Sequence, residues 1–237
     1  MLDANAAERT WIVIAAYCEQ RSIGNVVAAL RAAGWPRVVV VDDGSSDDTA
    51  GVAAKAGALV VQHVINRGQG AALQTGIRFA LRRGAAVLVT FDADGQHRAS
   101  DIAQLVAPVA EGGIDAALGS RFLAHAANVP WRRRWLLRGA VLFSRWTTGV
   151  ALTDAHNGLR ALSARLARRI DLHLDRMAHA SELVDQIVRS GLPWREVSVH
   201  IDYTAYSLAK GQRGSAAVRI VTDYLIGRLL GDRRRSP

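Results

Sequence analysis

The sequence predicts an α/β fold in which helices flank a mostly parallel central sheet. Short apolar runs alternate with segments of helical periodicity over the first 91 residues. This order is typical of parallel strands joined by right-handed crossovers. Acidic residues follow directly after two of the apolar runs. Because ligands bind at the carboxyl ends of the strands in such sheets, these acidic residues indicate a binding site.

The individual elements follow from the spacing of apolar residues and from turn residues. Strands are predicted over residues 11–16, 37–41, 58–62 and 86–91, and helices over 22–33, 47–56 and 70–83. In the second half, helices are predicted over residues 161–170, 181–190 and 216–230, and a strand over 197–203.

Composition indicates a folded chain from a reducing compartment. Half of the 237 residues are hydrophobic, which is enough for a sizeable core. Cys18 is the only cysteine, so no intramolecular disulfide can form. The first residues do not read as a signal peptide, and no apolar run approaches the roughly 20 residues that span a bilayer. We therefore expect a protein that is soluble or lies on a membrane surface.

Charge is distributed unevenly along the chain. Residues 1–120 contain 10 basic and 12 acidic residues, whereas residues 121–237 contain 20 basic and 9 acidic residues. A basic half predicts an anionic partner, which could be nucleic acid, a phosphate-bearing substrate or anionic lipid. A non-enzymatic nucleic-acid-binding protein is one alternative. However, the sequence has no zinc-finger spacing or RNP motif, and nucleic acid is not the expected partner.

The segment FDADGQH (91–97) predicts a metal site. In an extended chain, Asp92 and Asp94 lie on one face, and Gln96 continues the alternation. Carboxylate and amide oxygens together with a diphosphate suit Mg²⁺ or Mn²⁺. The alternative interpretation is a solvated turn rich in Asp and Gly.

Two further loops suit a nucleotide. In VDDGSSDDT (41–49), Asp42 or Asp43 could bind the base or the ribose, although a turn and a helix cap also explain this segment. The glycines of NRGQG (66–70) permit a close approach of backbone to ligand. The sequence lacks the P-loop motif, and no G-x-G-x-x-G follows the first strand. A dinucleotide-binding Rossmann enzyme is therefore disfavoured.

Seven segments in a fixed order carry a resemblance to a known family. They are IAAYCEQ (14–20), VVDDGSSDDT (40–49), NRGQGAALQTG (66–76), FDADGQH (91–97), GSRF (119–122), DAHNGLR (154–160) and YSLAKGQ (206–212). Over about residues 11–215 the chain resembles the family 2 glycosyltransferases with a GT-A fold. Within these it is most similar to the polyprenyl-phosphate sugar transferases of the dolichol-phosphate mannose synthase-like group. The resemblance implies metal-dependent, inverting transfer of a sugar from a nucleotide-sugar donor to a polyprenyl phosphate, undecaprenyl or dolichyl.

The resemblance also implies roles for the residues at matching positions. The metal and donor diphosphate would be held by Asp92, Asp94 and Gln96; the nucleoside by Tyr17, Glu19 and Asp42 or Asp43; and phosphate groups by Arg121, Lys210 and Arg213. On the acceptor side, Asp154, Gly158 and Arg160 match the D-x-x-x-G-x-R signature, and Glu182 matches an acidic helix residue. The chain departs from the family pattern at Ala15 (usually Pro), Cys18 (usually Asn) and Gln69 (commonly Lys).

The acceptor decides which residues would be catalytic. A lipid phosphate is already an anion and needs only positive charge, from Arg121, Lys210 or Arg213. A hydroxyl on a polysaccharide or lipid-linked glycan would instead need a base, and Asp154 or Glu182 would serve. Other interpretations are that Asp154 caps a helix or pairs with Arg160, and that Glu182 is a solvated helix residue.

The resemblance implies one GT-A domain over residues 1–215, with a nucleotide-binding half at 11–120 and an acceptor half at 121–215. An amphipathic helix and a basic tail are expected over 216–237. Trp and Arg alternate with aliphatic residues over 131–146, which suits a helix in the lipid headgroup region, although a core helix with a solvated Arg face is the alternative. We expect a cytoplasmic protein, peripheral at the inner face of the membrane, with the membrane surface or a membrane protein as partner.

Overall fold

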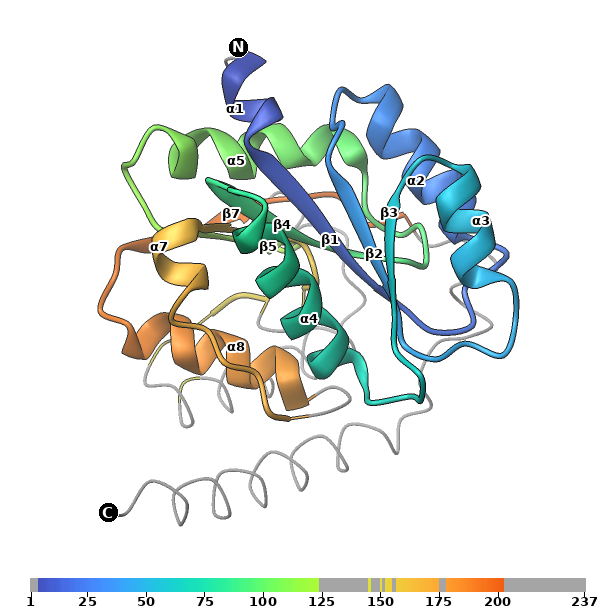
Figure 1. Ribbon diagram of the computed structural model, residues 1–237. Helices are drawn as coiled ribbons and strands as arrows, with labels where there is room; N and C mark the ends of the chain where they lie inside the picture. Colours follow the sequence, from blue (N-terminus) through green and yellow to red (C-terminus); the bar gives the residue numbers. More distant parts are fainter. Residues whose placement is uncertain are drawn as a thin grey trace, which may run out of the picture.

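A computed structural model describes residues 4–123, 145, 150, 152–154, 157–174 and 178–202 (Figure 1). The strands are β1 (Thr10–Ala16), β2 (Val38–Asp42), β3 (Leu59–Gln62), β4 (Val87–Asp92), β5 (Ala116–Ser120), β6 (Arg160–Ser163) and β7 (Trp194–Ser198). The helices are α1 (Ala4–Glu8), α2 (Ile23–Ala32), α3 (Thr49–Lys55), α4 (Gln69–Arg82), α5 (Ile102–Ala110), α7 (Ala164–Ala167) and α8 (Ala178–Arg189), with a 3₁₀ turn at Ala99–Asp101.

The strands form one sheet in the order β3-β2-β1-β4-β6-β5-β7. Strands β3, β2, β1 and β4 run parallel, β6 runs antiparallel to both of its neighbours, and β7 is parallel to β5. The register pairs Ala16 with Asp42 and Ala15 with Asp92, so β1, β2 and β4 end at the same edge. The predicted α/β fold with a mostly parallel sheet is confirmed.

Helices cover both faces of the sheet (Figure 1). Ile12 and Ile14 pack into a core that includes residues of α2 and α5, whereas Trp11 and Val13 pack into the core on the side of α4 and α8. Successive side chains of a strand point to opposite faces. A central strand buried on both sides therefore reads as an uninterrupted apolar run, which is why β1, β2 and β4 are visible in the sequence.

Two predictions for the second half of the chain are wrong. Residues 161–170 were expected to form a helix, but they enter strand β6 and then the short helix α7. The backbone of β6 pairs with β4 on one side and β5 on the other, and such pairing overrides a local helical pattern. The strand expected over 197–203 lies earlier, as β7, because its partner β5 runs alongside residues 194–198. Both α5 and β5 have no counterpart among the predicted elements.

Several predictions concern the chain outside the described residues. These are the headgroup helix over 131–146, the C-terminal helix and tail over 216–237, and the roles of Lys210 and Arg213. Within the described part of the chain, no helix combines the length and apolar character needed to cross a bilayer.

Asp115 ties the start of β5 to the end of β6. Its buried carboxylate accepts hydrogen bonds from Ser163 Oγ (2.5 Å) and from two guanidinium nitrogens of Arg165. The Arg165 hydrogen bond outweighs burial and, with the Ser163 bond and the charge of Arg165, holds the pKa of Asp115 below its ordinary value. The folded-state pKa is therefore lower than the unfolded one, and the resulting stability is lost as pH falls through it.

We expect Asp115→Asn to lower the free energy of unfolding by about 1–3 kcal/mol at pH 7, because charge-assisted hydrogen bonds are lost. The difference from wild type should shrink below about pH 4, near the unfolded pKa of an aspartate. Urea denaturation of both proteins at pH 7 and below about pH 4 measures the difference in the free energy of unfolding. The matched control is Asp48→Asn, which removes the charge of an exposed side chain that forms a 3.7 Å ion pair with Lys55. An equal difference at both pH values would contradict the ionic origin.

Candidate functional site

The carboxyl edge of the sheet collects the loops that carry the predicted site residues. The segments after β1, β2, β3, β4 and β5 all emerge there. Because β6 is antiparallel, the segment leading into it, of which residues 152–154 and 157–159 are described, arrives at the same edge. The topology therefore brings the D-x-D segment and the D-x-x-x-G-x-R segment together, although they are 60 residues apart in the chain.

Hydrogen bonds join the loop after β1 to the loop after β2. Cys18 N donates to Ser45 Oγ (2.9 Å), and Glu19 N donates to Thr49 Oγ1 (2.8 Å). Cys18 has a φ of 54°, in the left-handed region that Asn adopts more readily than Cys. This conformation gives a physical reason for the Asn that is usual at this position in the resembling family. Tyr17 is half exposed beside this junction, and Glu19 is buried.

The two aspartates after β2 are both buried but have different partners. Asp43 accepts from Arg67 N (2.9 Å) and Gly68 N (2.7 Å), and its Oδ1 lies 2.7 Å from His63 Nδ1. Its carboxylate therefore shapes the loop that leads into α4.

Asp42 instead accepts from Ser45 N (3.1 Å), from Ser45 Oγ, and from Gln62 Nε2 on β3 (3.3 Å). Both aspartates lie at the edge where a nucleoside was expected, and Asp43 is the one whose carboxylate fixes a neighbouring loop.

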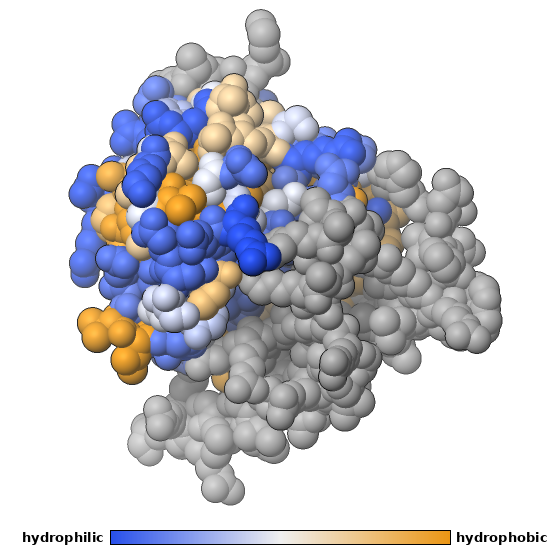
Figure 2. Space-filling model, turned by 90° about the vertical axis from the view of Figure 1, so that its right-hand side faces the viewer, coloured by the Kyte–Doolittle hydropathy of each residue, from blue (hydrophilic) through white to orange (hydrophobic). Residues whose placement is uncertain are grey.

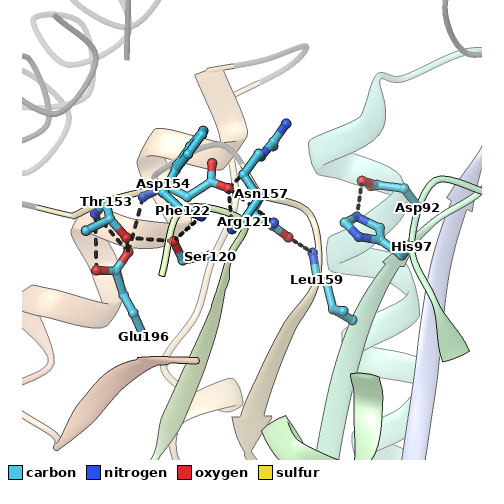
Figure 3. A network of polar contacts seen from close by, with 10 residues as sticks. All are labelled: Asp92, His97, Ser120, Arg121, Phe122, Thr153, Asp154, Asn157, Leu159 and Glu196. Carbon is cyan, nitrogen blue, oxygen red and sulfur yellow. Dashed lines mark hydrogen bonds and ion pairs between the residues drawn. The ribbon is translucent and has the colours of Figure 1, made fainter. Parts of the chain in front are cut away.

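Asp92 stands at the end of β4, beside His97. Its Oδ2 lies 2.9 Å from His97 Nε2 (Figure 3). A third of its side chain is exposed. Burial disfavours the charged form, yet the His97 hydrogen bond and the charges of His97, Arg160 and His179 hold its pKa below the ordinary value. The other ring nitrogen of His97, Nδ1, is buried without a hydrogen-bond partner among the described residues.

Asp94 has the opposite electrostatic character. Burial raises its pKa, the hydrogen bond from Gln96 N (3.0 Å) opposes this, and the negative charges of Asp92 and Glu19 raise it further. A cation between these carboxylates would relieve that repulsion. The described residues contain no cluster of three or more His, Cys, Asp or Glu side chains placed to hold a metal. Two carboxylates and an amide instead suit an ion such as Mg²⁺ that keeps water or phosphate ligands.

Gly158 lies directly against the Asp92 carboxylate. A Cβ at this position would stand 2.2 Å from Asp92 Oδ2 and 2.4 Å from Oδ1, where no side chain fits. Thr90 Oγ1 donates to Gly158 O (2.6 Å) and fixes this approach. Two residues later comes the buried Arg160. Burial lowers its pKa to about 10, although the negative charges of Asp92 and Asp154 raise it. At neutral pH it remains a buried cation behind the D-x-D segment.

Asp154 is paired with Arg121 (Figure 3). Its Oδ2 accepts from Arg121 Nε (2.7 Å), Arg121 N (3.2 Å) and Asn157 Nδ2 (3.3 Å), and its side chain is 5% exposed. Glu196 on β7 supports this arrangement by accepting from Thr153 N (2.9 Å), Thr153 Oγ1 (2.9 Å) and Asp154 N (3.2 Å). The direct partner of Asp154 is therefore Arg121.

Glu182 on α8 contacts backbone. Its carboxylate accepts from Leu174 N (2.8 Å) and His173 N (3.0 Å). Burial raises its pKa, and these hydrogen bonds oppose the shift. The segment it holds packs closely on the start of α4, because a Cβ on Gly70 would lie 2.2 Å from Leu174 O. The interpretation of Glu182 as a solvated helix residue is therefore wrong.

Three further residues contribute to this site and are not among the predicted site residues: His97, His179 and Glu196. His97 was inside a motif already singled out, and its place after Gln96 was a usable signal. His179 and Glu196 reach the site only through the packing of α8 and β7, and no local pattern marks them.

Comparisons with known proteins give a consistent result. Residues 11–170 match the family model described as glycosyl transferase family 2. The undecaprenyl-phosphate mannosyltransferase of Micrococcus luteus is 32% identical, with 96% of this chain and 98% of that protein covered. The polyprenol monophosphomannose synthase of Mycolicibacterium smegmatis is 36% identical, covering 70% of this chain and 65% of that protein.

Solved structures share the fold at lower identity. Glucosyl-3-phosphoglycerate synthase from Mycobacterium tuberculosis, in complex with Mg²⁺ and uridine diphosphate, superposes with a TM-score of 0.68. The identity is 20%, and the match covers 95% of this chain and 83% of that chain.

Proposed function

Because the chain belongs to glycosyl transferase family 2 and has a GT-A fold, we propose that it transfers a sugar from a nucleotide-sugar donor to a polyprenyl phosphate. Relatives at 30% identity or more that cover most of the chain support this acceptor. Besides the Micrococcus enzyme, they include the UDP-N-acetylglucosamine–dolichyl-phosphate N-acetylglucosaminyltransferase of Methanococcus voltae, which is 30% identical over 85% of this chain and 88% of that protein.

The observation that carries the choice of acceptor is that both candidate bases are engaged. Asp154 is almost fully buried and paired with Arg121, and Glu182 accepts from two backbone amides. A hydroxyl acceptor needs a carboxylate within reach of its proton, whereas a phosphate acceptor is already ionised. The site therefore suits an anionic acceptor that requires cations and no base.

Asp92, Asp94 and Gln96 are the proposed holders of the metal and the donor diphosphate. When bound there, Mg²⁺ or Mn²⁺ would stabilise negative charge on the departing nucleoside diphosphate. The lowered pKa of Asp92 and the negative charges around Asp94 fit a divalent cation. The loops carrying Tyr17, Glu19, Asp42 and Asp43 are the proposed nucleoside side, within residues 11–120.

The proposed reaction is a single displacement. An oxygen of the acceptor phosphate forms a bond to the anomeric carbon as the bond from that carbon to the nucleoside diphosphate breaks, with inversion and without net proton transfer. Arg121, which also pairs with Asp154, and the buried Arg160 are proposed to supply positive charge near the reacting groups, and preorganised charge of this kind is a large term in catalysis. Lys210 and Arg213 are proposed to add to it from the acceptor half, at the inner face of the membrane.

The test uses purified protein, Mg²⁺ or Mn²⁺, a panel of radiolabelled nucleotide sugars and polyprenyl phosphate. We expect label to enter the organic phase only when metal is present. Asp94→Asn should abolish the transfer, and the surface control Asp48→Asn should retain it. Label that instead enters a water-soluble glycan, without any need for polyprenyl phosphate, would replace this proposal with the hydroxyl-acceptor alternative.

A further inference from the structure

Most of the exposed large apolar side chains of the described residues lie at the edge of the sheet that carries the site. The whole set in this part of the chain is Tyr17, Leu59, Val64, Ile65 and Leu123. Four of these five follow the carboxyl ends of β1, β3 or β5, and only Leu59 begins a strand. Val64 and Ile65 are the most exposed, at 99% and 68%, and they are adjacent in the loop between β3 and α4.

This loop is anchored firmly on both sides of the apolar pair. His63 N donates to Asp42 O (2.9 Å), and the His63 ring lies between Asp43 Oδ1 (2.7 Å) and Thr75 Oγ1 (3.0 Å). On the other side, the amides after Asn66 donate to Asp43. Val64 and Ile65 therefore stand on a fixed projection.

The backbone beneath the projection is also closely packed. Gly44 has a φ of 71°, and a Cβ there would lie 2.7 Å from the carbonyl carbon of Ile65. Figure 2 shows an apolar projection at the lower corner of the visible face, at the level where the β3–α4 loop lies in Figure 1. Two β-branched side chains held in water are unfavourable, so a partner that covers them gains binding energy.

A lipid bilayer fits this position in three ways. The proposed acceptor keeps its hydrocarbon chain in the bilayer and its phosphate at the surface, so the carboxyl edge must face the membrane. Exposed Arg67 stands beside the apolar pair, and aliphatic residues with a neighbouring arginine suit an anionic interface. Leu123 directly precedes the chain that contains residues 131–146, whose Trp and Arg pattern predicts a headgroup helix.

We propose that Val64 and Ile65 form a membrane-contact tip that docks the carboxyl edge of the sheet on an anionic lipid bilayer. The orientation of the tip rests on the proposed function, because only a lipid acceptor requires this edge to face the membrane. The binding itself needs no donor, metal or acceptor, so it can be measured separately from transfer.

The experiment measures binding of the full chain to vesicles of phosphatidylcholine and phosphatidylglycerol that contain no polyprenyl phosphate. We expect the double variant Val64→Ser/Ile65→Ser to bind about tenfold more weakly than wild type, because two aliphatic side chains no longer enter the interface. The matched control Leu59→Ser removes an exposed apolar side chain at the start of β3 and should bind as wild type does. Circular dichroism confirms that each variant is folded.

Two outcomes overturn the proposal. The first is equal vesicle binding by the double variant and wild type. The second is a wild-type dimer in light scattering that the double variant converts to monomer while vesicle binding is unchanged, which would assign the tip to a second copy of the chain. If the tip supports vesicle binding but no label reaches polyprenyl phosphate, the membrane contact stands and the proposed acceptor is wrong.

Discussion

Asp92→Asn is expected to lower kcat/KM for sugar transfer by about 10²–10³-fold, the size of effect seen when a preorganised charge at a reacting centre is removed. The substitution keeps the shape of the side chain but removes the charge that faces His97, Arg160 and the proposed cation. Both cation affinity and transfer should fall together.

Titration with Mn²⁺ in the presence of a nucleoside diphosphate, followed by the paramagnetic signal of free Mn²⁺, gives a readout that does not depend on turnover. Asp48→Asn is the matched control, because Asp48 is exposed and forms a 3.7 Å ion pair with Lys55. A melting temperature for each variant separates loss of the cation from loss of the fold. Unchanged Mn²⁺ affinity in Asp92→Asn would remove this residue from the metal site.

Gly158→Ala is expected to lower Mn²⁺ affinity and kcat/KM by about 10–100-fold, which is the usual cost of disturbing a group that orients a metal ligand. The new methyl group would stand 2.2 Å from Asp92 Oδ2, so the carboxylate or the loop that faces it must move. Gly113→Ala is the matched control, because the nearest atom to its Cβ is Pro108 O at 3.7 Å.

The two substitutions act on the same carboxylate, so their effects should not add. We expect the double variant Asp92→Asn/Gly158→Ala to be no worse than Asp92→Asn alone. Additive losses, or an affinity for Mn²⁺ in Gly158→Ala that matches wild type, would show that Gly158 acts elsewhere.

The fold of residues 10–92 was predictable because β1, β2 and β4 are buried on both faces and the helices between the strands have one apolar face. The antiparallel strand β6 was not predictable, because it has only four residues and one of them is the buried Arg160. Its pairing with β4 and β5 is what makes this segment a strand. The missed strand β5 has the same cause, since small residues such as Ala117 and Gly119 give no strand pattern of their own.

The predicted site residues among the first 123 positions lie at the carboxyl edge of the sheet. Each of their motifs follows a strand, and these strands all end at that edge. The partners of the site residues were not predictable from spacing. The alternative pairing of Asp154 with Arg160 follows from sequence proximity. Their charges do interact, but the guanidinium seen to hydrogen-bond Asp154 belongs to Arg121, on another strand end. Likewise, the partners of Glu182 are backbone amides of a preceding loop, which no side-chain pattern encodes.

The central claim is that the sugar is transferred to the phosphate of a lipid. The most direct measurement supplies the enzyme, its donor and Mn²⁺ with either a polyprenyl phosphate or the polyprenol of the same chain length, and identifies the product by mass spectrometry. We predict a glycosyl phosphodiester from the phosphate and no product from the alcohol. A glycoside formed on the polyprenol would contradict the account, because it would require a base that neither Asp154 nor Glu182 is free to provide in this arrangement.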